Sequence, residues 1–182
     1  MDGVLADFDQ HVFDAALGID FPEAALRREA RFCTDFLSKR GRARVRAYIE
    51  SGHFFRGLPL VPGALEGVAG LEAAGHDLWV CSKPLEANPH CASDKMGWIE
   101  EHFPSLVGKV ILAPKKSMIK GDVLLDDAHK VRDFHEASWV PVWYPYPHNF
   151  NVDRAYWSWG DPVEDLVRYA EAWSFYKEEL YS

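Results

Sequence analysis

The chain has 182 residues, of which 48% are hydrophobic, so it can bury the core of one domain and carry a small inserted cap. Its formal net charge of -8 excludes a non-specific binder of nucleic-acid polymers, which needs a basic face, but local lysines can still bind a small anionic substrate. Cys33, Cys81 and Cys91 fit no metal-ligand spacing and predict reduced thiols. The chain does not open with a signal-peptide pattern, and no apolar run approaches the roughly 18 residues of a membrane-spanning helix, so we predict a cytoplasmic protein without membrane contact.

The first third of the chain predicts a strand end, a helix and a charged helical segment. Residues 3–6 are typical of the tail of a short buried strand, and apolar residues at helical spacing over 8–17 predict a helix that Gly18 ends. Residues 22–51 are helical in pattern and rich in arginine, which favours a solvated cap, although a plain surface face of the core is the alternative. We therefore predict a small helical cap over residues 19–58.

Strands and helices alternate along the rest of the chain. Helices are predicted from 62 to 75, 93 to 102, 130 to 136 and 162 onward, and strands at 77–81, 109–112, 123–125 and 139–143. This alternation predicts an α/β fold with a mostly parallel sheet that helices flank on both sides. Residues 1–18 and 59–182 would form this core.

Side chains suited to phosphoryl transfer follow the predicted strands. Asp2, Ser82 and Lys116 follow the first three strands, and Asp126 and Asp127 follow the fourth. In such a sheet, functional residues lie outside the carboxyl ends of the strands. Carboxylates can hold Mg2+, a lysine can neutralise phosphate oxygens, and a hydroxyl can orient them. A further carboxylate can protonate a leaving alkoxide and later activate water.

The order of these residues resembles the haloacid dehalogenase superfamily of phosphatases, and more closely the 5'(3')-deoxyribonucleotidases. The resemblance covers nearly the whole chain and is weak across 19–48. The segments that carry it are residues 2–8, 50–55, 60–64, 91–95, 110–112 with Lys116, 122–127, 148–149 and 158–159. It implies a Rossmann-like core with a small helical cap, in agreement with the alternation of strands and helices.

The resemblance also implies roles for individual residues in a Mg2+-dependent hydrolysis of (deoxy)nucleoside monophosphates to nucleoside and phosphate. Asp2 is implied as the general acid and base, and Lys116 as a lysine that contacts phosphate and steadies the nucleophile. Asp2, Asp126 and Asp127 are the implied Mg2+ ligands. The implied phosphate-binding residues are Ser82, Lys83 and Lys116, although Lys83 stands where vertebrate members have a second hydroxyl.

For the rest of the substrate, the resemblance implies contacts from three residues. Phe8 and Phe55 match aromatic residues that line the nucleoside pocket, and Lys95 matches a lysine near the substrate. From the residues alone, Phe8 fits the core as well as it fits a pocket. The implied partner is a small-molecule nucleotide rather than a nucleic-acid polymer, and a homodimer is implied by the resemblance alone.

The nucleophile of the first motif is an Asp that would stand directly before Met1 and form an aspartyl-phosphate. We therefore expect the chain as printed to lack appreciable phosphatase activity. A shifted register, in which Asp7 and Asp9 form the Asp-x-Asp pair, would misplace Asp2 and the match at Phe8. Two alternative functions remain open: a phosphatase of another small phosphomonoester, and a catalytically inactive nucleotide-binding relative.

Overall fold

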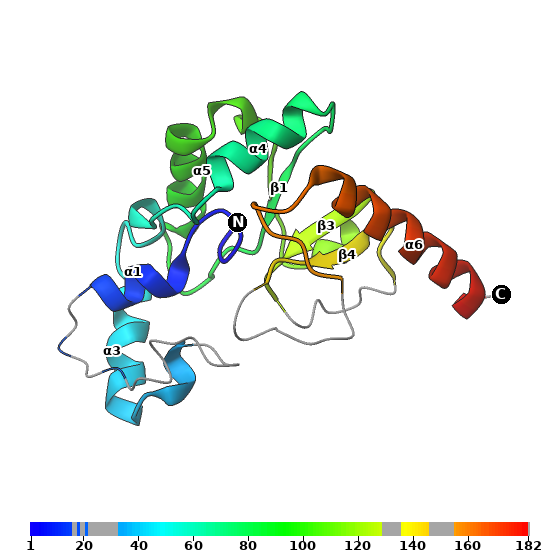
Figure 1. The fold of residues 1–182 in the computed structure, drawn as a ribbon. Coiled ribbons are helices and arrows are strands. Elements are labelled where there is room, and N and C mark those ends of the chain that lie inside the picture. The colour runs from blue at the N-terminus through cyan, green and yellow to red at the C-terminus, as the bar shows by residue number, and fades with distance from the viewer. Residues whose placement is uncertain (16–17, 19–20, 22–32, 129–135, 146–154, 182) are drawn as a thin grey trace.

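The structure is a computed structural model that describes residues 1–15, 18, 21, 33–128, 136–145 and 155–181 (Figure 1). The helices are α1 (Phe8–Asp14), α3 (Lys39–Ile49), α4 (Ala64–Ala73), α5 (Cys91–His102) and α6 (Val163–Tyr181). The strands are β1 (Val80–Ser82), β2 (Val110–Leu112), β3 (Val123–Asp126) and β4 (Val140–Trp143). Short 3-10 helices cover Cys33–Phe36, Phe55–Gly57, Pro104–Leu106 and Lys116–Met118.

All four described strands lie in parallel pairs. β1 pairs with β2 so that Val80 lies beside Val110, and α5 is the crossover between them. β3 pairs with β4 so that Asp126 lies beside Trp143. The α/β, Rossmann-like fold is confirmed, but among the described residues the expected single sheet is present as two two-stranded sheets.

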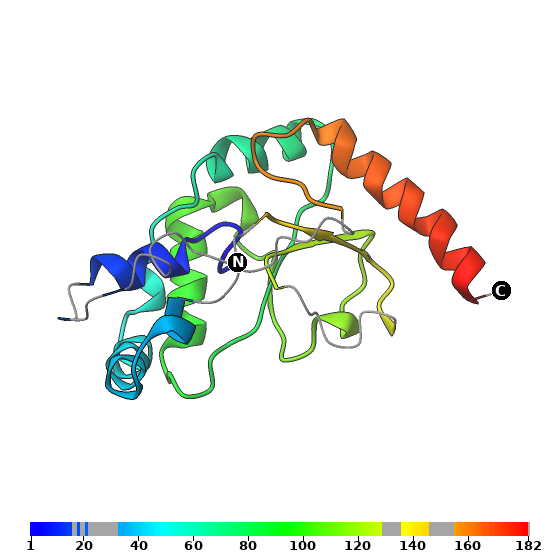
Figure 2. The same ribbon diagram turned by 60° about the horizontal axis from the view of Figure 1, so that its bottom comes forward.

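The helices form where the apolar spacing predicted them. Asp7 caps α1 by accepting a hydrogen bond from the Gln10 backbone N at 3.1 Å. α4 buries Ala64, Val68 and Leu71, which lie four and then three residues apart on one face. α6 packs on β4 at the opposite side of the molecule from α1 and α3 (Figures 1 and 2).

Residues 3–6 form a turn, so the expected strand tail is wrong. The Met1 carbonyl accepts hydrogen bonds from the backbone N of Val4, Leu5 and Ala6, at 3.2, 2.8 and 3.2 Å. Gly3 allows this turn because its φ of 73° lies in the left-handed region that favours glycine. The segment is nevertheless buried, as the apolar pattern indicated.

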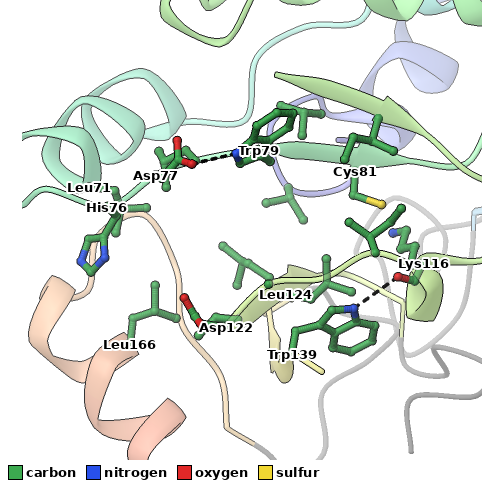
Figure 3. Close-up of a pocket in the computed structure, with 18 of the residues that line it drawn as sticks. Leu71, His76, Asp77, Trp79, Cys81, Lys116, Asp122, Leu124, Trp139 and Leu166 are labelled. Atoms are coloured by element: carbon green, nitrogen blue, oxygen red, sulfur yellow. Dashed lines mark hydrogen bonds between the residues drawn. The ribbon is translucent and has the colours of Figure 1, made fainter. Parts of the chain in front are cut away.

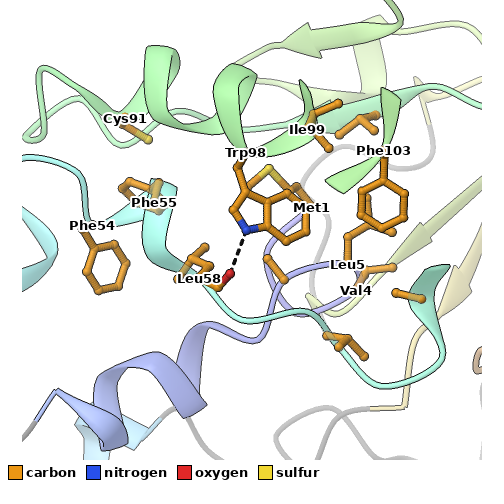
Figure 4. Packing of buried hydrophobic residues seen from close by; sticks show 14 of the residues in the cluster. Met1, Val4, Leu5, Phe54, Phe55, Leu58, Cys91, Trp98, Ile99 and Phe103 are labelled. Atoms are coloured by element: carbon orange, nitrogen blue, oxygen red, sulfur yellow. Dashed lines mark hydrogen bonds between the residues drawn. The ribbon is translucent and has the colours of Figure 1, made fainter. Parts of the chain in front are cut away.

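Two apolar clusters hold the helices to the sheets. In the larger cluster, Met1 and Leu5 pack with Trp98 of α5, whose indole N–H donates to the Leu58 carbonyl at 2.7 Å (Figure 4). The smaller cluster joins β4 to α6 and contains Leu71, Val140, Val142, Trp157 and Leu166. The N-terminal turn is therefore part of the main core.

α1 and α3 lie together at one end of the molecule (Figure 1). His11 Nε2 and Tyr48 Oη share a hydrogen bond of 2.9 Å, and Arg44 donates to the Gly18 carbonyl at 2.9 Å. The cap over 19–58 stays a prediction. The expected helix at 130–136 and the resemblance at 148–149 lie outside the described residues, apart from Glu136.

Candidate functional site

The candidate site lies where β1 and β3 end and the N-terminal turn meets them. Ser82 is the last residue of β1, and Asp126 is the last residue of β3. Both are buried, with 3% and 4% of their surface exposed. Polar side chains in such a place need charged or hydrogen-bonding partners, and two lysines supply them.

Lys95 of α5 is the centre of one half of the site. Its ammonium group donates to Asp2 Oδ2 at 2.5 Å, to Ser82 Oγ at 2.9 Å and to the Lys83 carbonyl at 3.1 Å. It also lies 4.7 Å from the centroid of the Phe55 ring, a cation–π contact. Lys95 is only 1% exposed, so all three donors of its ammonium group are used inside the protein.

Asp2 has one occupied and one available carboxylate oxygen. Oδ2 accepts from Lys95, whereas Oδ1 is buried and has no hydrogen-bond partner among the described residues. The side chain as a whole remains 30% exposed. An oxygen in this state is available to accept a hydrogen bond or to contact a cation.

Lys116 is the centre of the other half. Its ammonium group donates to Asp126 Oδ2, and Asp126 Oδ1 accepts from the Ala128 backbone N at 2.9 Å. Burial lowers the pKa of Lys116, but the carboxylates of Asp126 and Asp127 outweigh burial, so this pKa lies above its ordinary value. The lysine therefore stays charged and is available to bind an anion.

Asp127 holds a proton more readily than an ordinary carboxyl group. Burial and the neighbouring Asp126 raise its pKa to about 7, although Lys116 and the Met1 amino group lower it. Gly3 packs directly on the Asp127 carboxyl group, and a Cβ at Gly3 would overlap it. This close approach holds the N-terminal turn against the end of β3.

The amino group of Met1 joins the two halves. It is buried, and burial together with the positive charge of Lys116 lowers its pKa. Asp2 and Asp126 act in the opposite direction, and Lys95 lowers the pKa further. Met1 therefore lies within electrostatic range of both lysine–carboxylate pairs.

The structure thus brings together Asp2, Ser82, Lys95, Lys116, Asp126 and Asp127. The side chains of Lys83, Phe8 and Phe55 have other surroundings. The Lys83 side chain is exposed, and its carbonyl is the group that contacts Lys95. Phe8 is half-buried against Phe54 at 5.2 Å, and Phe55 is 3% exposed under Lys95. The burial of Lys95 is not among the features predicted from the sequence, although Lys95 follows buried Cys91 by four residues and precedes buried Trp98 by three.

The donor set suits a hard cation, but the carboxylates are held by lysines. The available groups are carboxylate oxygens, the ligand type that Mg2+ prefers. Within the described ranges, no three His, Cys, Asp or Glu side chains stand close enough to hold a metal. A bound cation would give the unpartnered Asp2 Oδ1 a partner and would favour the charged form of Asp127, whose pKa is raised by burial and by Asp126.

Comparison with known proteins gives one consistent family. Residues 1–173 match the sequence model of the family described as 5' nucleotidase, deoxy (pyrimidine), cytosolic type C protein (NT5C). The chain is 31% identical to the human 5'(3')-deoxyribonucleotidase, cytosolic type, with 92% of this chain and 90% of that protein covered. It is 32% identical to a Bordetella pertussis protein named as a putative 5'(3')-deoxyribonucleotidase, with 87% of this chain and 88% of that protein covered. It is 29% identical to the mouse mitochondrial 5'(3')-deoxyribonucleotidase, with 92% of this chain and 82% of that protein covered.

The parallel α/β fold and these matches define a phosphoric monoester hydrolase of the 5'-nucleotidase type with a haloacid dehalogenase-like fold. Because the relatives carry both cytosolic and mitochondrial names, the compartment of this chain stays a prediction. No helix of the described part is long and apolar enough to cross a membrane. The chain belongs to the 5' nucleotidase, deoxy (pyrimidine), cytosolic type C family.

Proposed function

We propose that this chain hydrolyses (deoxy)nucleoside monophosphates to nucleoside and phosphate at the site around Lys95 and Lys116. The observation that carries the proposal is that buried Lys95 holds Asp2 of the N-terminal turn and Ser82 at the end of β1, while half-buried Lys116 holds Asp126 at the end of β3. Family membership supplies the reaction class. Lys116 and a bound Mg2+ would supply the positive charge with which a chain of net charge -8 binds a phosphate.

Phosphate would bind between Ser82 and Lys116. Ser82 Oγ accepts from Lys95, so its own proton is available to donate to a phosphate oxygen. Lys116 keeps its charge and would exchange part of its contact with Asp126 for a phosphate oxygen. Lys83 is exposed beside Ser82 and would approach phosphate only from the rim.

Asp2 would move the proton. Lys95 fixes Oδ2, and Oδ1 is the oxygen that we assign to proton transfer. In the first step an aspartate oxygen forms a bond to phosphorus, the P–O bond to the nucleoside breaks, and the leaving alkoxide takes the proton from Asp2. In the second step water loses a proton to Asp2, attacks phosphorus and releases phosphate, which regenerates the attacking carboxylate and the protonated Asp2.

The attacking aspartate would be a residue joined to the amino group of Met1. This position lies within electrostatic range of Lys116 and Lys95, the two cations that would steady a carboxylate there. Asp7, the alternative in the shifted register, serves as the cap of α1. These two observations support the register in which Asp2 is the second aspartate of the motif.

We propose Asp126, Asp127 and Asp2 as the residues that would hold Mg2+, which when bound would neutralise phosphate oxygens. The base would contact Phe8, which retains exposed surface next to Phe54. Phe55 and Lys95 are buried against each other, and this packing favours support of Asp2 over direct contact with the nucleoside. Their contact with substrate stays a prediction.

The test is phosphate release from deoxynucleoside monophosphates, ribonucleoside monophosphates and sugar phosphates with Mg2+. The chain as printed is compared with a chain that carries Asp before Met1 on an apolar leader. We expect release only with the added Asp, and nucleotides preferred over sugar phosphates. Equal rates with and without the Asp would rule out this register. Preference for sugar phosphates would favour another phosphomonoester, and binding without turnover in the extended chain would indicate an inactive nucleotide-binding relative.

A further inference from the structure

Two tryptophans, Trp139 and Trp143, stand at the two ends of strand β4. Trp139 directly precedes the strand, and Trp143 is its last residue. Trp139 is 3% exposed, and Trp143 is half-buried. Neither residue takes part in the reaction proposed above, but the indole groups of both donate hydrogen bonds to segments that carry the site.

Trp139 holds the segment of Lys116. Its indole N–H donates to the Lys116 carbonyl at 3.3 Å (Figure 3). Lys116 begins a single 3-10 turn that ends at Met118, in the connection between β2 and β3. The backbone bonds of this turn are local, from Met118 N to the Lys115 carbonyl at 3.4 Å and from Ile119 N to the Lys116 carbonyl at 3.0 Å. The turn therefore does not fix its own place beside the sheet, and the buried indole ties it to the start of β4.

Trp143 holds the loop that follows β3. Its indole N–H donates to the Ala128 carbonyl at 3.1 Å. The backbone N of Ala128 donates in turn to Asp126 Oδ1 at 2.9 Å, which leaves Asp126 Oδ2 for Lys116. Asp127 stands between the two bonded residues, so the contact of Trp143 also fixes the backbone that carries the Asp127 carboxyl group.

The two indoles act on the two partners of one ion pair. Lys116 is held through its carbonyl at the start of β4, and its ammonium group reaches Asp126, which lies beside Trp143 at the end of β4. A shift of either backbone segment would change where the ammonium group meets the carboxylate. Any buried indole N–H needs an acceptor, but here both acceptors belong to the segments of the site.

We propose that Trp139 and Trp143 are positioning residues with separate tasks: Trp139 sets the Lys116 ammonium group for phosphate, and Trp143 sets the carboxyl groups of Asp126 and Asp127 for Mg2+. This inference rests on the proposed function, which assigns phosphate and Mg2+ to those residues. Hydrogen bonds that orient metal-binding carboxylates are typically worth about 10- to 100-fold in metal affinity. The tasks are separable because the two indoles bond to different segments.

The test measures the dissociation constants of Mg2+ alone and of inorganic phosphate without Mg2+, so it does not depend on turnover. Trp143→Phe should weaken the binding of Mg2+ about 10-fold and leave that of phosphate within about two-fold. Trp139→Phe should weaken the binding of phosphate about 3- to 10-fold, the effect of one misplaced hydrogen bond, and leave that of Mg2+ within about two-fold.

Trp157→Phe is the matched control. Trp157 is 1% exposed, and its indole N–H donates to the carbonyl of Pro162, directly before α6, at 2.9 Å. This variant loses a buried indole bond of the same kind, but the acceptor carries no residue of the site. Both dissociation constants should therefore stay within about two-fold of those of the wild type.

Benzothienylalanine at position 139 or 143 separates the hydrogen bond from the packing. It keeps the shape of the indole ring and replaces the N–H by sulfur, so it removes the donor without leaving a cavity. It should reproduce the pattern of the phenylalanine variants, and it takes their place if they do not fold. In 15N–1H spectra of the wild type, Mg2+ should shift the indole signal of Trp143, and phosphate that of Trp139.

Unchanged constants in both variants, or equal losses for both ligands in all three, would overturn the proposal and make Trp139 and Trp143 packing residues. If the wild type binds both ligands and the variants do not separate them, the proposed function survives this failure. If the variants separate the ligands but nucleotides are not hydrolysed, the positioning roles stand and hydrolysis is refuted. A wild type that binds neither ligand would overturn both.

Discussion

The Lys95 ammonium group lies 2.5 Å from Asp2 Oδ2, which ties helix α5 to the N-terminal turn. The same ammonium group reaches Ser82 Oγ at 2.9 Å, so one buried cation sets the distance between a carboxylate of the N-terminal turn and a hydroxyl at the end of β1. A buried lysine is rarely kept without such partners. This arrangement assigns Lys95 a positioning role in the proposed reaction.

We predict that Lys95→Met lowers kcat by about 100-fold, because Asp2 loses the contact that orients its carboxylate. KM should change little, since phosphate would contact Ser82 and Lys116. Steady-state kinetics in the chain with the preceding Asp measures both constants. The matched control is Lys115→Met, which removes an exposed ion pair with Glu136 and should leave kcat within about two-fold.

The stability of the Lys95→Met variant separates positioning from folding. Asp2 remains 30% exposed and can be hydrated, and the methionine keeps the apolar packing of the lysine stem. We therefore expect a loss of about 1–2 kcal/mol in the free energy of unfolding, below the roughly 3–5 kcal/mol of a fully buried broken pair. A rise in KM with unchanged kcat would instead make Lys95 a substrate-binding residue.

The sequence predicts much of this site because strand ends are visible in it. Apolar runs followed by Ser82 and Asp126 place these residues at the carboxyl ends of β1 and β3. Lys95 could not be placed in the same way, since its partners lie up to 93 residues away and lysine is usually exposed. The turn at 3–6 was missed because the apolar pattern does not report the left-handed backbone of Gly3.

His11 gives a pH-dependent stability. Burial lowers the pKa of His11 from its ordinary value of 6.5, and Asp14 opposes this only partly. The unfolded chain therefore binds a proton more readily than the folded protein does. The contribution of His11 to the free energy of unfolding is fully present above the ordinary pKa of 6.5, and it is lost as the pH falls from there through the lowered pKa of the folded protein. Urea unfolding between about pH 5 and pH 8 should show this loss in the wild type and a smaller one in His11→Gln.

The cause can be tested with the partner of His11. Tyr48→Phe removes the hydrogen bond to His11 but keeps an aromatic ring beside it. Because burial rather than the hydrogen bond lowers the pKa, the pH dependence should persist in this variant. Its disappearance would contradict the assignment to burial.

Asp127 should report cation binding through stability. In the metal-free protein it is a buried carboxyl group beside Asp126, so Asp127→Asn should raise the Tm by several degrees, at about 2–4 °C per kcal/mol. Mg2+ should raise the Tm of the wild type but not that of the variant, because the variant lacks one of the proposed ligands. Thermal unfolding with and without Mg2+ measures both effects.

Asp122→Asn is the matched control, because Asp122 is exposed and stands directly before the first residue of β3, whereas Asp127 follows the last one. It should preserve the Mg2+ response of the wild type. A Mg2+ response that survives Asp127→Asn would remove Asp127 from the proposed ligand set.

Gly3 and Gly75 form a matched pair for the packing of the N-terminal turn. Both have positive φ values, 73° and 89°, so alanine at either position strains the backbone by about 1–2 kcal/mol. A Cβ at Gly75 meets nothing within 4 Å, whereas a Cβ at Gly3 would overlap the Asp127 carboxyl group. Gly3→Ala should therefore lower the free energy of unfolding more than Gly75→Ala does, by about 1–3 kcal/mol. Gly3→Ala should also reduce kcat at least ten-fold, because it moves Asp2 away from Lys95. If the two variants lose the same stability and kcat does not change, the contact between the turn and Asp127 does not position the site.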